Sequence, residues 1–142
     1  MKIHYLATSN VPSRTANSLQ IIKMCDSISK LGHEITLIVP NLISPDISLK
    51  KYYDLNNNFK LIKVGGIKKF VEGINNVLIP IRLIIQSIIL KCDLIITRNS
   101  LISLILIILR KKHILEIHDD LKVSGSLISK IFKTFNLLNS NS

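Results

Sequence analysis

The chain has 142 residues, the size of one ordinary domain, and 47% of them are hydrophobic. This composition excludes wholesale disorder and supplies enough apolar side chains for a real core. Lys and Arg total 19 against nine Asp and Glu, so the net charge is +10. Residues 1–59 have six basic and four acidic side chains, whereas residues 60–142 have thirteen and five.

The sequence gives no support for a membrane-spanning, secreted or metal-binding protein. The first eight residues hold too short an apolar run for a signal peptide. The longest apolar stretches, 77–90 and 101–109, fall short of the ~20 residues that a membrane-spanning helix needs. Cys25 and Cys92 lie far apart in apolar surroundings and form no metal-binding pattern. We therefore expect reduced thiols, no metal site and a cytoplasmic protein.

Strands and helices are predicted to alternate along the chain. Apolar runs bounded by polar residues predict strands at residues 3–7, 34–39, 59–64, 93–97 and 113–117. Apolar side chains at helical spacing predict helices at residues 17–31, 70–91, 100–110 and 124–138. Continuously apolar strands that alternate with helices are typical of a parallel sheet. The sequence therefore predicts one α/β domain over residues 1–142, a Rossmann-like open parallel sheet sandwiched by helices.

Local signals mark the ends of several predicted elements. Thr15 or Asn17 can cap the first helix, and Gly32 ends it. Pro80 is expected to kink or break the second helix. The third helix, residues 100–110, is apolar almost all round, so we expect it to be buried.

The loop after the first strand, residues 8–15, excludes several nucleotide-binding classes. It holds no glycine, so it lacks the GxGxxG turn of a dinucleotide site, and the chain has no P-loop motif. The acidic pair of a receiver domain is also absent. The loop instead offers hydroxyls and Arg14, with Asn17 close by at a helix N-terminus, where oxyanions or sugar hydroxyls bind. A plain capped helix start explains the same residues, and both interpretations stay open.

Two more polar groups follow predicted strands. Arg98 and Asn99 come after the fourth strand, and an arginine there can hold a phosphate or carboxylate by a bidentate contact. His118 ends the fifth strand, with Asp119 next to it and Glu116 on the same side of the strand. A carboxylate neighbour raises the pKa of a histidine and fixes its tautomer, which suits general acid/base work. A solvated arginine and a histidine that caps a turn are the alternatives.

The remaining charged clusters favour a structural interpretation. His33 lies between a predicted helix and a predicted strand, where we expect a structural role. Residues 110–112 (Arg-Lys-Lys) follow a helix, and cations are favoured there by the helix dipole. We expect this cluster and the pairs at 50–51 and 68–69 to be solvated.

Three segments carry a family resemblance. They are the loop SNVPSRTANS with the following LQIIKMCDSISKLGHEITLIVPN, the segment DLIITRN, and the segment ILEIHDD. In this order and approximate spacing they resemble the N-terminal domain of family 4 glycosyltransferases of the GT-B fold. The resemblance covers essentially the whole chain.

The resemblance implies where a ligand would bind. Such enzymes have two Rossmann-like domains that face each other across a cleft, and the N-terminal domain mainly recognises the acceptor. The resemblance implies a catalytic role for His118 near the reacting sugar. It implies that the acceptor side of the cleft is lined by Ser13, Arg14, Thr15, Asn17, Ser18, Arg98, Asn99 and Asp119.

The family's donor-binding Glu-x7-Glu signature does not occur in these 142 residues. The resemblance implies that a C-terminal half binds the nucleotide-sugar donor, so this chain would be truncated or need that half on another chain. We therefore expect little or no transfer by the chain alone. By the same resemblance the reaction retains configuration and needs no metal or cofactor, because basic side chains and helix dipoles stabilise the leaving diphosphate.

The function expected is that of the acceptor-side domain of a hexosyltransferase in cell-surface polysaccharide or glycolipid synthesis. Its acceptor would be a sugar or a lipid-linked sugar. The alternative is a non-catalytic binding or scaffold module, whose basic half docks on a partner chain or peripherally on the anionic inner face of the membrane. Nucleic acid is not an expected partner, because aromatic residues make up only 5% and no binding motif occurs.

Overall fold

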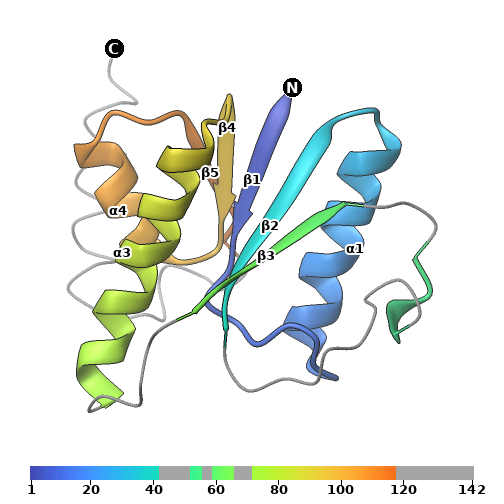
Figure 1. Cartoon of the computed structure of the whole chain (residues 1–142), viewed down its shortest axis with the longest axis horizontal. Coiled ribbons are helices and arrows are strands. Elements are labelled where there is room, and N and C mark those ends of the chain that lie inside the picture. Colours follow the sequence, from blue (N-terminus) through green and yellow to red (C-terminus); the bar gives the residue numbers. More distant parts are fainter. Residues whose placement is uncertain (42–51, 56–58, 66–71, 118–142) are drawn as a thin grey trace.

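The computed structural model describes residues 1–41, 52–55, 59–65 and 72–117, which form an open α/β sheet (Figure 1). Five parallel strands pair in the order β3-β2-β1-β4-β5. The strands are β1 (Lys2–Leu6), β2 (Glu34–Pro40), β3 (Lys60–Val64), β4 (Leu94–Thr97) and β5 (His113–Leu115). The helices are α1 (Ala16–Lys30), α3 (Glu72–Leu90) and α4 (Ser100–Ile108). The predicted Rossmann-like α/β class is therefore confirmed.

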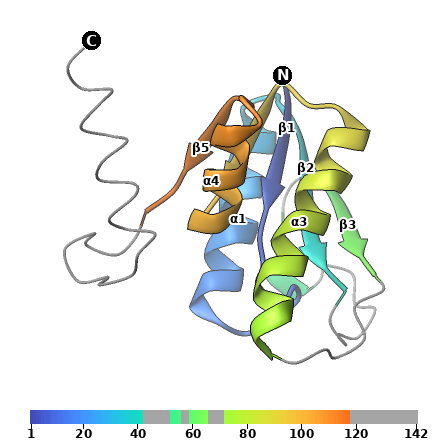
Figure 2. The ribbon, with the colours of Figure 1, turned by 90° about the vertical axis from the view of Figure 1, so that its left-hand side faces the viewer.

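Helices cover both faces of the sheet, with α3 and α4 on one face and α1 on the other (Figure 2). Each face has its own apolar core, as expected for a parallel sheet whose strands are buried on both sides. The core on the α1 side is built around Tyr5, Ile22 and Leu37, which are fully buried. The core on the α3 and α4 side is built around Leu83 and Leu106.

The first helix forms as its sequence signals predict. Thr15 is the N-cap, and its hydroxyl oxygen accepts a hydrogen bond from the backbone N–H of Ser18 at 3.3 Å. The helix ends at Lys30, and Gly32 follows with φ +82, a left-handed conformation that favours glycine. The buried Cys25 lies on its sheet-facing side, and burial raises the pKa of this thiol to about 12.

The second helix differs from the sequence-based prediction at Pro80. The sequence predicted a kink or break at Pro80, whereas α3 continues through that residue from Glu72 to Leu90. A break at Pro80 is therefore wrong, while the alternative of a kink stays a prediction. Apolar packing explains the continuity: Leu83 and Ile84, on the next turn, are buried against the sheet. Tertiary packing thus outweighs the lost backbone hydrogen bond.

The third helix and the last strand are shorter than predicted. Helix α4 ends at Ile108, and burial is confined to one side of it, so Ile108 itself is largely exposed. Strand β5 ends at Leu115 rather than at residue 117, although the Glu116 N–H still donates to the Thr97 carbonyl at 2.9 Å. The helix predicted at 124–138 lies outside the described residues. Within the described ranges no helix is both long and apolar enough to cross a bilayer.

A buried histidine links the central strand to α3. His4 on β1 is buried, and its Nδ1 lies 2.8 Å from the hydroxyl oxygen of Ser87, which is also buried. Burial lowers the pKa of His4 below its ordinary value of 6.5, because the charged imidazolium loses its hydration. The folded protein therefore favours the neutral form of this side chain.

Acid is expected to destabilise the protein through His4. Its pKa is lower in the folded state, so below pH about 6.5 the unfolded chain binds a proton that the folded chain does not. The stability that neutral His4 contributes is complete above that pH and is lost as the pH falls toward the folded-state pKa. Thermal unfolding followed by circular dichroism between pH 8 and pH 5 measures this loss. A His4→Asn variant that keeps the full wild-type slope, with His33→Asn as control, contradicts the assignment.

Candidate functional site

The predicted site residues that the structure describes lie in the segments that follow the carboxyl ends of β1 and β4. Strand β1 leads into the polar loop 8–15, and β4 leads into Arg98 and Asn99. Because β1 and β4 pair in parallel, with Leu6 beside Thr97, their two loops emerge side by side. The Thr97 hydroxyl donates to the Leu6 carbonyl at 3.0 Å and holds the two strand ends together.

A small pocket of about 140 Å³ opens between these loops. It lies at the edge of an open α/β sheet where ligands bind in this class of fold. Its polar lining combines hydroxyl, amide and guanidinium groups from the loop after β1, from α1 and from the β4–α4 turn. The lining residues are Leu6, Ala7, Thr8, Ser9, Asn17, Ile21, Arg98 and Asn99.

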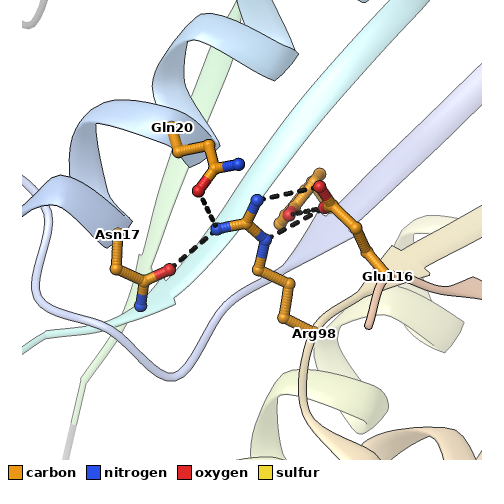
Figure 3. A network of polar contacts seen from close by, with 5 residues as sticks. Asn17, Gln20, Arg98 and Glu116 are labelled. Carbon is orange, nitrogen blue, oxygen red and sulfur yellow. Dashed lines mark hydrogen bonds and ion pairs between the residues drawn. The ribbon is translucent and has the colours of Figure 1, made fainter. Parts of the chain in front are cut away.

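Arg98 is the centre of a polar network beside this pocket (Figure 3). Its Nε donates to Glu116 Oε2 at 3.0 Å and its Nη2 donates to Glu116 Oε1 at 2.8 Å, a bidentate ion pair. Its Nη1 donates to Asn17 Oδ1 at 2.9 Å and to Gln20 Oε1 at 3.2 Å. The arginine therefore ties α1, the end of β4 and the end of β5 into one site.

The carboxylate of Glu116 also accepts a hydrogen bond from the core. The buried Tyr5 hydroxyl donates to Glu116 Oε2 at 2.7 Å. Burial, and then this bond, raise the pKa of Tyr5 far above its ordinary value, so the phenol stays protonated. The hydrogen bond to Glu116, opposed by partial burial, raises the pKa of Arg98. The site thus holds a paired cation and carboxylate with little net charge.

The expected bidentate contact of Arg98 is present, but Glu116 of this chain makes it rather than a ligand. Four donors of the guanidinium group are used within the protein. An anionic ligand at Arg98 would compete with Glu116, whereas an uncharged ligand with hydroxyl groups would not. This geometry therefore favours an uncharged polar ligand.

Tyr53, a residue that the sequence did not indicate, holds Ser13 of the polar loop and Ser18 of α1. The Tyr53 hydroxyl donates to the Ser13 carbonyl at 2.8 Å and accepts from the Ser13 N–H at 2.7 Å. It also lies 2.7 Å from the Ser18 hydroxyl, which is buried. Tyr53 thus holds Ser13 and Ser18, neither of which lines the pocket, and Arg14 is exposed.

Asn17 and Asn99 lie at the pocket with defined partners. The Asn17 amide nitrogen donates to the Ser9 hydroxyl at 2.6 Å, while its oxygen accepts from Arg98. The Asn99 side-chain oxygen caps α4 by accepting from the backbone N–H groups of Leu101 and Ile102. Thr15, predicted both as a cap and as a cleft residue, is exposed and acts as the cap of α1.

The structure does not place every predicted residue. His118 and Asp119 lie outside the described residues, so their predicted roles stay predictions. Among the residues that the structure describes, no group of three His, Cys, Asp or Glu side chains could hold a metal ion.

The arrangement can bind a small, uncharged molecule through several hydrogen bonds. Hydroxyl groups and amide side chains both donate and accept, as recognition of a sugar hydroxyl requires. The apolar lining residues Leu6 and Ile21 are almost fully buried, so a ligand would contact mainly the polar groups of the pocket. Comparison with known proteins adds no assignment, since neither a family model nor a curated protein matches this chain.

Proposed function

We propose that this chain is the acceptor-side domain of a nucleotide-sugar-dependent glycosyltransferase. The observation that carries the proposal is the pocket at the carboxyl edge, where Arg98 is neutralised by Glu116 and held by Asn17. A neutral, hydrogen-bonding pocket suits an acceptor sugar better than it suits the diphosphate of a donor. The resemblance of the loop, DLIITRN and ILEIHDD segments to GT-B enzymes of family 4 supports the same role.

In this proposal the chain positions the acceptor and a second half binds the donor. The pocket residues hydrogen-bond the acceptor hydroxyls, and His118 acts near the reacting sugar. Transfer retains configuration and uses no metal, because the donor half stabilises the leaving diphosphate. The product would be a glycan or glycolipid of the cell surface.

Reconstitution tests the proposal. The DNA beside the codon for Ser142 is expected to encode a βαβ-rich segment with the Glu-x7-Glu signature. Co-expression of that segment with this chain should give transfer from a radiolabelled nucleotide sugar to added cell-envelope acceptors. Each half alone is the control and should give background counts. Transfer that is as fast without this chain as with it would show that the acceptor is bound elsewhere.

A further inference from the structure

The outer face of α3 is apolar. Val77, Ile81, Ile85, Ile88 and Ile89 are all exposed and follow helical spacing along its solvent side. The opposite side of the same helix is packed against the sheet, so α3 is apolar both toward the sheet and on this outer face. A contiguous exposed apolar face of this kind marks an interaction surface.

A basic pocket adjoins the C-terminal end of this face. It has a volume of about 300 Å³ and is lined by residues at the C-terminal ends of α3 and α4 and at the start of β4, at the opposite edge of the sheet from Arg98. Its lining residues are Ser87, Ile88, Lys91, Cys92, Asp93, Ile95, Arg110, Lys111 and Lys112. Four of these are cationic and one is acidic. That carboxylate, Asp93, already accepts a hydrogen bond from the Lys2 backbone N–H at 2.7 Å.

The cations of the pocket point to an anionic partner. Residues 110–112 were expected to be solvated, and all three are exposed, as is Lys91. Lys91 and Arg110 adopt φ of 53 and 51, so a cationic side chain stands after each helix where glycine is usual. Exposed Ile108 and Leu109 lie just before the basic run. Charge and apolar surface therefore occur together at this end of the molecule.

We propose that the α3 face and the basic pocket together dock on an anionic phospholipid membrane. The isoleucines of α3 enter the boundary between headgroups and acyl chains, and the pocket cations contact lipid phosphates. The residue types favour a membrane over a protein partner. Protein interfaces are enriched in aromatic residues and depleted in lysine, whereas this surface combines isoleucine with three lysines. The inference does not depend on the sugar site.

Vesicle flotation tests the proposal with the full 142-residue chain. Vesicles of phosphatidylcholine with about one third phosphatidylglycerol are compared with vesicles of phosphatidylcholine alone. The protein is expected to float with the anionic vesicles at low salt and to be released by high salt, because ionic screening weakens the attraction. Equal recovery with both kinds of vesicle, or none with either, overturns the proposal.

Matched variants locate the surface. Lys111→Glu is expected to weaken binding at least about fivefold, since each cation near an anionic membrane contributes about that factor. The control is Lys23→Glu, at an exposed position of α1, because it changes the net charge by the same amount. Ile85→Ser, 50% exposed on α3, should also weaken binding, whereas Leu19→Ser, 46% exposed on α1, should not.

Two results with these variants would refute the assignment. Equal losses in the two lysine variants would mean that net charge alone attracts the chain to the membrane. Self-association measured by sedimentation velocity, abolished by Ile85→Ser and accompanied by no vesicle binding, would assign the α3 face to a second copy of this chain. Both measurements are independent of sugar transfer, so they separate this inference from the proposed function.

Discussion

In the reconstituted enzyme, His118→Ala is expected to reduce sugar transfer at least about a hundredfold, the usual contribution of a general acid or base. His118 follows two residues after Glu116, whose carboxylate is held by Arg98 and Tyr5 at the edge of the candidate pocket. Because only one residue separates His118 from Glu116 in the sequence, the proposal assigns it to the acceptor side of the site. The measurement is the initial rate of transfer from the nucleotide sugar.

The same variant should leave the fold intact. The circular dichroism spectrum and melting temperature of His118→Ala are expected to match those of the wild type. His33→Ala, at the turn between α1 and β2, is the control and should keep full activity. Transfer by His118→Ala at the wild-type rate would remove His118 from the mechanism.

Arg98→Met is expected to lower the free energy of unfolding by about 2–3 kcal/mol, the range for losing charged hydrogen bonds in a partly buried site. The side chains of Arg98 and Glu116 are only 14% and 19% exposed, so solvent screens their attraction weakly. Removal of the arginine leaves the Glu116 carboxylate without its cation. Urea unfolding followed by far-ultraviolet circular dichroism measures the loss.

The double variant Arg98→Met/Glu116→Gln separates the contribution of the ion pair from that of side-chain packing. It is expected to lose less stability than the sum of the two single variants, because neither charge is left alone. The control is Arg82→Met on α3, whose side chain is exposed and makes one long hydrogen bond to the Gly65 carbonyl. Its effect should stay within about 0.5 kcal/mol. If Arg98→Met costs no more than Arg82→Met, the network does not stabilise the site.

The sequence predicts the fold well because its strands are continuous apolar runs bounded by polar residues. All five predicted strands are present, and every end except the C-terminal end of β5 lies within one residue of its prediction. The largest differences are at β5, an edge strand with one neighbour, and at Pro80, where core packing outweighs local backbone preference. Local sequence signals do not include such tertiary contacts, so they cannot predict the cases in which packing decides the structure.

The site was predicted only in part. Arg98, Asn17 and Asn99 could be found because each stands next to the end of a strand or the start of a helix. Tyr5 and Gln20 could not be found from the sequence. A strand or helix pattern predicts on which face of the element a side chain lies, but not which distant residue it contacts. The contact of Arg98 with Asn17 joins residues 81 apart in the sequence.

Tyr53 was missed for a related reason. It lies in a segment with no predicted element, yet its hydroxyl contacts both Ser13 of the loop and Ser18 of α1. The sequence indicates Glu116 as a neighbour of His118, but it does not indicate that Glu116 is the partner of Arg98. The order of strands β1, β4 and β5 in the sheet brings Tyr5, Arg98 and Glu116 together.

Titration of the isotope-labelled chain with simple sugars, followed by amide NMR, tests the central claim most directly. Methyl α-glucoside, methyl α-galactoside, N-acetylglucosamine and N-acetylgalactosamine are suitable probes. The account predicts saturable shifts with at least one of them at residues 8, 9, 17, 98 and 99, which line the pocket, and their loss in Asn17→Ala. No saturable shifts with any probe, or shifts confined to the basic pocket at the opposite edge, would contradict a sugar acceptor site at Arg98.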